Sequence, residues 1–160
     1  MRSEVSIFPF IPVRLVKEDA EALSALERLC FSSPWKLEQL RNALELPHFI
    51  AYGIKYQDEL LAYISLAHIL DELEVLNLAT HPSSRRKGLA RCLITYVLKS
   101  MQNLGAKQIT LEVRTGNIPA RNLYASVGMI QVGIRKHYYT DTGEDALILK
   151  KETADFEADI

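Results

Sequence analysis

Apolar residues recur along this chain with two spacings, and the change from one to the other separates predicted helices from predicted strands. Spacings of three and four residues put side chains on one face of a helix and define helical segments at 18–30, 34–47 and 89–104. Alternating or continuous apolar runs define predicted strands at 13–16, 49–56, 60–70, 73–80, 109–114, 129–137 and 146–150. This order predicts an α/β (α+β) fold, with a mixed β-sheet flanked by helices.

Residues with special backbone preferences mark the predicted helix ends. Ser33 suits the N-cap of the second helix, with Pro34 at the first helical position. Gly105 suits the end of the third helix, and Asn117 opens a short fourth helix that stops near Gly128. The face of the first helix that is expected to pack inward consists of Ala22, Leu23, Leu26, Leu29 and Cys30.

The length of the chain predicts one domain. With 160 residues, it can bury about 70 % of the surface of its unfolded form. We expect the domain to span 1–151. Residues 152–160 are acidic and contain no Lys or Arg, so they are expected to form a frayed tail.

Neither a targeting signal nor a disulfide scaffold is expected. The apolar stretch at 7–11 contains Pro9 and is followed by Pro12, and no run approaches the roughly 18 apolar residues of a membrane span. The two cysteines, Cys30 and Cys92, fit reduced thiols. The sequence therefore predicts a soluble, cytoplasmic protein.

Charge is nearly balanced but unevenly distributed. A net charge of -1 argues against a protein whose main task is to coat nucleic acid. No Lys or Arg lies between Lys55 and Arg85, and this window is either a solvated face or an acidic substrate side. Its acidic residues are Asp58, Glu59, Asp71, Glu72 and Glu74.

A short basic loop carries the clearest chemical signal. The sequence Arg85-Arg86-Lys87-Gly88-Leu89-Ala90-Arg91 joins a predicted strand to a predicted helix. The first N–H groups of a helix lack partners and lie at the positive end of its dipole, so this junction suits a diphosphate. Gly88 has no Cβ and permits close approach to the backbone. The same pattern also describes an ordinary solvated crossover, and it is not a Walker A motif.

The loop also carries a resemblance. A strand, then R/Q-x-x-G-x-G/A, then a helix is the acyl-CoA signature of the GCN5-related N-acetyltransferase (GNAT) family, which Arg85-x-x-Gly88-x-Ala90 resembles. The similarity covers about residues 72–149 and points to the branch that acetylates protein N-termini, above all the RimI type, which acts on the N-terminal alanine of a small-subunit ribosomal protein. It implies acetyl-CoA as cosubstrate, no metal, and a protein N-terminus as partner. Neither membrane binding nor direct nucleic-acid binding is expected, because the chain has no long apolar run and its basic cluster is local.

The resemblance implies a cofactor site with two parts. Loop amides hold the pyrophosphate of acetyl-CoA, and the end of the preceding strand pairs with the pantetheine arm. Asn117 contacts CoA by the same resemblance, although helix capping alone would explain it. The residues implied are Leu78, Ala79, Thr80, Arg85, Arg86, Lys87, Gly88, Leu89, Ala90, Arg91 and Asn117.

Aminolysis of a thioester needs a base for the ammonium and an acid for the departing thiolate. An α-amine has a pKa of about 8 and lysine about 10.4, so an α-amine needs the weaker base. Without the resemblance, the pattern predicts that Glu112 is a solvent-facing strand residue and that Tyr124 is a core aromatic. The resemblance makes Glu112 the proton acceptor and Tyr124 the acid beside the CoA sulfur.

Two adjacent tyrosines are the candidate substrate contacts. Neighbouring strand residues face opposite ways, so only one of Tyr138 and Tyr139 faces the core. The resemblance implies that such tyrosines grip a peptide backbone, and the alternative is a strand-end aromatic pair. Trp35 is expected to be a buried hydrophobic anchor.

Substrate choice stays open. Arg85 stands where RimI-type sequences often have Gln, and Ala90 replaces the second Gly. Both residues also occur in eukaryotic and archaeal N-terminal acetyltransferases. The alternatives are a lysine or small-amine acetyltransferase, a non-catalytic acyl-CoA-binding module, and a nucleic-acid binder built on the basic loop.

Overall fold

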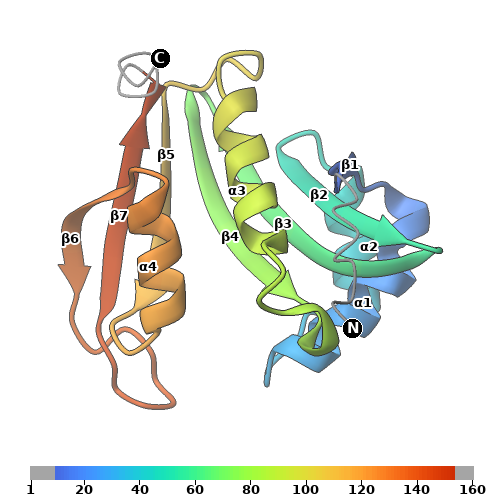
Figure 1. Ribbon diagram of the computed structural model, residues 1–160, viewed down its shortest axis with the longest axis horizontal. Coiled ribbons are helices and arrows are strands. Elements are labelled where there is room, and N and C mark those ends of the chain that lie inside the picture. The colour runs from blue at the N-terminus through green and yellow to red at the C-terminus, as the bar shows by residue number, and fades with distance from the viewer. Residues whose placement is uncertain (1–9, 154–160) are drawn as a thin grey trace, which may run out of the picture.

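One seven-stranded sheet organises the fold (Figure 1). The computed structural model describes residues 10–153. The strand order is β1-β2-β3-β4-β5-β7-β6, and every neighbouring pair is antiparallel except β4 and β5, which are parallel. The strands are β1 Val13–Arg14, β2 Phe49–Tyr56, β3 Glu59–Ile69, β4 Glu72–Thr80, β5 Gln108–Arg114, β6 Ile130–Arg135 and β7 Ala146–Glu152. This mixed sheet confirms the predicted fold class.

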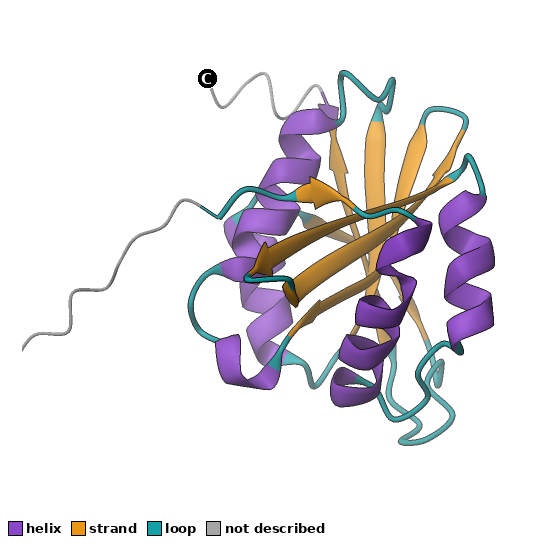
Figure 2. Ribbon diagram, turned by 90° about the vertical axis from the view of Figure 1, so that its right-hand side faces the viewer, coloured by secondary structure: helices purple, strands orange, loops and turns teal. Residues whose placement is uncertain are grey.

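Helices lie on both sides of the sheet (Figure 2). They are α1 Ala20–Cys30, α2 Leu37–Glu45, α3 Leu89–Ser100 and α4 Ile118–Ser126, with short 3-10 turns at Lys17–Asp19 and Pro82–Ser84. None of the helices in residues 10–153 has the length and apolar character needed to cross a membrane.

Two apolar clusters fill the layers. The larger lies between the sheet and α3 and α4, and contains Ile64, Leu93 and Leu111. The smaller lies between the sheet and α1 and α2, and contains Leu23 and Leu40. Within the described residues, the smaller cluster includes no side chain of β5, β6 or β7. That half of the sheet is therefore packed on one face and open on the other.

The sheet splits between β4 and β5, the one parallel pair among the strands of residues 10–153. β4 and β5 pair from Glu72–Glu74 to Gln108–Thr110 and then separate toward their carboxyl ends (Figure 1). In the β3–β4 pair, Ser65 faces Asn77 and Leu66 faces Val75, which leaves Leu76 as a bulge. A bulge bends and twists its strand, so it turns β4 away from β5.

Most predicted boundaries agree with the structure, but the start of α2 is wrong. α2 begins at Leu37, after Lys36, whose N–H donates to Gln39 Oε1 at 2.9 Å. Ser33 and Pro34 therefore precede the helix. The reason is tertiary: the Trp35 N–H donates to Glu27 Oε2 at 3.3 Å, which holds this segment outside helical geometry.

Three other expectations need adjustment. Leu29 was expected on the inner face of α1 and is 55 % exposed, whereas Glu27 is buried. α3 ends at Ser100, and a run of turns leads to Gly105 at φ +73°. β7 includes Glu152, and 154–160 lie outside the described residues, as do 7–9 of the N-terminal apolar stretch.

The cysteines are free thiols, as predicted. Cys30 Sγ donates to the Thr80 carbonyl at 3.4 Å, and Cys92 Sγ donates to the Phe10 carbonyl at 3.2 Å. Burial raises the pKa of both thiols, which does not favour a nucleophile in either place.

Candidate active site

The carboxyl ends of β4 and β5, where the two strands separate, place the basic loop and the residues that follow Glu112 at one edge of the sheet. Because the two strands are parallel, their carboxyl ends lie at the same edge, followed by α3 and α4 respectively (Figure 1). The helices touch where Arg91 Nη2 donates to Ser126 Oγ at 2.6 Å. Past Glu74, the β5-facing edge of β4 has no strand partner in the described chain. Such an edge can pair with an extended ligand.

The basic loop leads into the start of α3, a helix terminus of the kind that suits an anion. Gly88 is the N-cap of α3 at φ +82°, without a side-chain cap, and a Cβ built there meets nothing within 4 Å. Arg86 also has a positive φ of 63°, so the loop turns sharply before the helix. The surrounding basic side chains are exposed: Arg85, Arg86, Lys87 and Arg91. Unused N–H groups, a helix dipole and cationic side chains together suit a diphosphate.

The end of β4 offers backbone groups beside this loop. Leu78 packs toward α3, Ala79 is buried toward α1, and Thr80 ends the strand. The Thr80 carbonyl accepts from Arg85 Nε at 3.3 Å. At the start of α3, Leu89 is 2 % exposed and Ala90 is half-buried, so Leu89 can meet a ligand only through its backbone.

Glu112 lies on the open face of β5, as the alternation predicted. Leu111 and Val113 are buried on the other face, and Glu112 is half-buried. Glu112 Oε1 pairs with Arg135 Nε at 2.7 Å. Arg135 lies on β6 and reaches across β7, a contact that sequence reasoning missed because only the β5-β7-β6 strand order creates it.

Tyr124 lies on α4 and is 7 % exposed. Burial, with a smaller effect from the Tyr139 phenol, raises the pKa of Tyr124 to about 12. The hydroxyl therefore keeps its proton throughout the physiological range and lies close enough to Tyr139 to sense its charge. It is able to act as a proton donor.

Tyr138 and Tyr139 are in the connection between β6 and β7, and their predicted place on a strand is wrong. β6 ends at Arg135, and His137 has φ +51°, so the chain turns before the tyrosines. Their rings pack edge to face at 5.2 Å. Tyr138 is 46 % exposed and Tyr139 is half-buried. A hydrogen bond to Glu112 raises the pKa of Tyr138, which ties this loop to the β5 carboxylate.

Ion pairs hold the same loop against the end of β5. Arg114 forms two bonds to Asp141, Nη1 to Oδ1 at 2.8 Å and Nη2 to Oδ2 at 2.9 Å. The Arg114 guanidinium also lies 3.9 Å from the centre of the Tyr139 ring. This hydrogen bonding lowers the pKa of Asp141. No local sequence pattern predicts the Arg114–Asp141 pair.

Asn117 caps α4, as predicted. Its Oδ1 accepts from the Ala120 N–H at 3.3 Å. A contact with CoA stays a prediction. Trp35, expected to be a buried anchor, is half-buried and packs against the α1–α2 cluster, with its ring 6.0 Å from that of Phe49.

The acidic window does not form one surface. Asp58 and Glu59 lie at the β2–β3 turn, whereas Asp71 lies at the β3–β4 turn, at the opposite end of β3. At about 3.3 Å per residue, the 11 residues of β3 extend roughly 36 Å between these groups. Only Glu74 of the window lies where β4 begins to leave β5.

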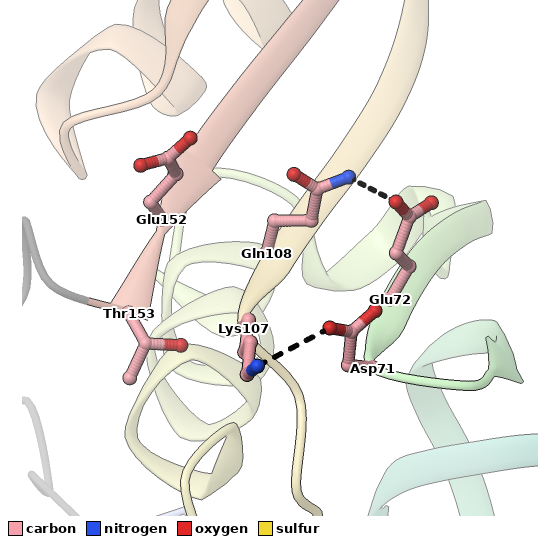
Figure 3. A pocket seen from close by; sticks show the side chains of 6 residues that line it. All are labelled: Asp71, Glu72, Lys107, Gln108, Glu152 and Thr153. Atoms are coloured by element: carbon pink, nitrogen blue, oxygen red, sulfur yellow. Dashed lines mark hydrogen bonds and ion pairs between the residues drawn. The ribbon is translucent and has the colours of Figure 1, made fainter.

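A surface pocket at the other end of β4 and β5 is separate from the motif residues (Figure 3). Its acidic side chains are engaged: Asp71 pairs with Lys107 at 3.7 Å, and Glu72 accepts from Gln108 at 2.5 Å. Among residues 10–153, no group of three or more His, Cys, Asp or Glu side chains is arranged to hold a metal ion.

Known proteins resemble this chain in sequence and in fold. The family model described as "Acetyltransferase (GNAT) family" matches residues 20–129. A Haemophilus ducreyi protein named "[Ribosomal protein bS18]-alanine N-acetyltransferase" is 34 % identical over 78 % of this chain and 86 % of its own. A Bacillus subtilis relative, which bears that name provisionally, is 35 % identical over 82 % of this chain and 88 % of its own. The crystal structure of the ribosomal-protein-S18-alanine N-acetyltransferase from Escherichia coli superposes with a TM-score of 0.82, at 27 % identity, and covers 89 % of this chain and 93 % of that one.

Proposed function

Because the chain belongs to the acetyltransferase (GNAT) family, we propose that it acetylates the α-amine of a protein N-terminus by direct transfer in a ternary complex. The family resemblance expected from the sequence is confirmed. The protein is an N-acetyltransferase, and acetyl-CoA is its cosubstrate. The observation that carries the proposal is the split sheet, which opens between the basic loop and the cluster around Glu112.

The proposed acetyl-CoA site follows the β4 side of the split. The N–H groups at the start of α3 and the side chains of Arg85–Arg91 hold the diphosphate. The unpaired edge at Leu78–Thr80 hydrogen-bonds the pantetheine arm. Acetyl-CoA supplies the acetyl group as an activated thioester.

The proposed chemistry uses the β5 side. Glu112 accepts the proton that the ammonium loses before the neutral amine attacks the thioester carbonyl, and its place on the open face leaves it accessible to an amine. Tyr124 donates a proton to the departing thiolate, because burial keeps its hydroxyl protonated. Tyr138 and Tyr139 contact the first residues of the peptide, and the Arg114–Asp141 pair steadies their loop.

The substrate proposed is the N-terminal alanine of a ribosomal protein in the cytoplasm. Relatives that match most of this chain are named as alanine N-acetyltransferases of ribosomal protein bS18. Ribosomal proteins are basic, and the exposed carboxylate of Glu74 lies near the split, on the strand opposite Glu112.

The test is to incubate the protein with acetyl-CoA and a peptide that has an N-terminal alanine, basic following residues and one internal lysine. Mass spectrometry locates the acetyl group, and the same peptide with a blocked N-terminus is the control. Modification of the α-amine alone supports the proposal. Modification of lysine alone favours a lysine acetyltransferase, and acetyl-CoA binding without release of CoA favours a non-catalytic module.

A further inference from the structure

A carboxylate that the proposed chemistry does not use lies inside the layer between α1 and the sheet. Glu27 is 1 % exposed. Its Oε1 accepts from the Tyr63 hydroxyl and, at 3.2 Å, from Asn77 Nδ2, while its Oε2 accepts from the Trp35 N–H at 3.3 Å. Among the described residues, no Lys, Arg or His forms an ion pair with it. Three hydrogen bonds thus compensate for its burial.

The direction of each hydrogen bond to Glu27 is fixed by the chemistry of its donor. Tyr63 is itself 1 % exposed, and burial together with the bond to Glu27 raises its pKa far above the ordinary range. The tyrosine therefore donates and the carboxylate accepts. An amide nitrogen and a backbone N–H, which cannot reverse their direction, complete the set.

These bonds connect two parts of the molecule that border the split. Asn77 directly follows the bulge at Leu76, where β4 turns away from β5. Trp35 belongs to the segment between α1 and α2. Cys30, the last residue of α1 and the start of the connection to that segment, donates to the Thr80 carbonyl at the end of β4. Glu27 therefore holds the α1–α2 segment beside the free edge of β4.

The open face places this segment next to the acceptor. Glu112 lies on the face of β5 opposite the α3 cluster, which is the face that α1 and α2 cover on β2–β4. An amine that reaches Glu112 has the α1–α2 segment on one flank and the Tyr138 loop on the other. The hydrogen bond between Glu27 and the Trp35 N–H holds the α1–α2 segment in position.

We infer that Glu27 is a positioning residue for the acceptor, because it joins the Trp35 segment to Asn77 and so fixes the flank along which a peptide N-terminus enters. This rests on the proposed function. Glu27 touches no reacting atom. It acts through the backbone at Trp35 and through β4.

The variant that tests this is Glu27→Gln, which keeps the size of the side chain but replaces one acceptor oxygen by an NH₂ group. One of the three donors then meets another donor, so the segment shifts. Since a displacement of about 1 Å can cost about 100-fold in rate, we expect kcat/KM for the peptide to fall about 10- to 100-fold. Hydroxylamine is too small to depend on contacts with the α1–α2 segment, so its rate of acetylation should change by less than about threefold. The Kd of acetyl-CoA should also change by less than about threefold.

Two further variants complete the experiment. Tyr63→Phe keeps the ring and removes one donor, so it should lower peptide kcat/KM in the same selective way and to a smaller extent, even if Glu27→Gln fails to fold. Glu21→Gln changes an exposed glutamate of the same helix, paired only at the surface with Arg41, and should leave both acceptors unaffected.

The outcomes separate the two proposals. Equal losses for peptide and hydroxylamine in the folded variants, or no loss for the peptide, would overturn the role of Glu27 while the proposed function stands. A wild-type protein that acetylates hydroxylamine but no peptide N-terminus would overturn the proposed function, and the role of Glu27 with it.

Discussion

Replacing Tyr124 by Phe removes one oxygen atom and leaves the ring in the core. The ring is 7 % exposed and belongs to the larger apolar cluster, so its packing is retained. Loss of the hydroxyl should change the free energy of unfolding by about 1 kcal/mol or less. A large loss of turnover would therefore report on the chemistry rather than on the fold.

The expected loss follows from the protonation state of the hydroxyl. Burial raises the pKa of Tyr124 to about 12, so only about 0.1 % is ionised at pH 9, compared with about 10 % for an ordinary tyrosine. The acid form is present at every working pH. A general acid contributes about 10²- to 10⁴-fold, and we expect kcat to fall by that factor, equivalent to about 2.7–5.5 kcal/mol in the activation free energy.

The assay measures CoA release from acetyl-CoA with the alanine peptide between pH 7 and pH 10, beside calorimetric binding of acetyl-CoA. Tyr52→Phe is the matched control, because Tyr52 is also 7 % exposed in the same cluster but lies on β2. The Kd of acetyl-CoA should stay within about threefold in both variants. Unchanged kcat in Tyr124→Phe would refute the acid role, and a fall in wild-type activity between pH 8 and pH 10 that the variant lacks would refute the elevated pKa.

Three other perturbations test the site and its supports. Glu112→Gln removes the proposed proton acceptor, so kcat should fall about 10²- to 10⁴-fold in the CoA-release assay while acetyl-CoA binding is retained. Gly88→Ala puts a Cβ on a residue at φ +82°, which costs about 1–2 kcal/mol even though the space is empty, so calorimetry should show weaker acetyl-CoA binding and melting a lower Tm. Asp141→Asn removes a carboxylate whose pKa Arg114 lowers; wild type should be the more stable protein above about pH 4, and its advantage in urea unfolding should disappear as pH falls through the lowered folded pKa.

Each of these has a result that would contradict it. Normal turnover in Glu112→Gln would mean that another group or the solvent accepts the proton. Unaltered acetyl-CoA affinity in Gly88→Ala would show that the start of α3 does not hold the diphosphate. A stability difference between wild type and Asp141→Asn that grows below pH 4 would have the wrong sign for a carboxyl group with a lowered pKa.

Local patterns predicted the parts of the site that lie on single elements. Alternation along β5 placed Glu112 on the open face, and the cap at Asn117 located the start of α4. The Gly88 loop was found because a helix N-terminus and its glycine are neighbours in sequence. Strand periodicity and helix capping depend on residues close together in the chain, so a single sequence is sufficient to predict them.

Features that depend on distant contacts were missed. The Glu112–Arg135 pair depends on β7 lying between β5 and β6, and the split begins beside a bulge at Leu76 that only the pairing with β3 reveals. Glu27 lies four residues after Leu23, so helical periodicity is sufficient to place it on the inner face of α1. Its hydrogen bond to the Trp35 N–H, and the later start of α2 that follows from it, cannot be predicted from local sequence. Tertiary hydrogen bonds overrode the local helix-start signal.

The short pairing of β4 with β5 has a mechanical consequence. Among residues 10–153, strand pairing joins β1–β4 to β5–β7 through three residue pairs, Glu72–Glu74 with Gln108–Thr110, so the two halves of the sheet are plates on a narrow hinge. Little backbone hydrogen bonding resists a change in the angle between the plates, so the apolar cluster under α3 and α4, which contains Ile64 of β3 and Leu111 of β5, holds them together. The unpaired edges of β4 and β5 beyond the hinge should exchange their amide hydrogens faster than the paired end. A ligand that bridges the hinge would couple the plates and slow exchange in both.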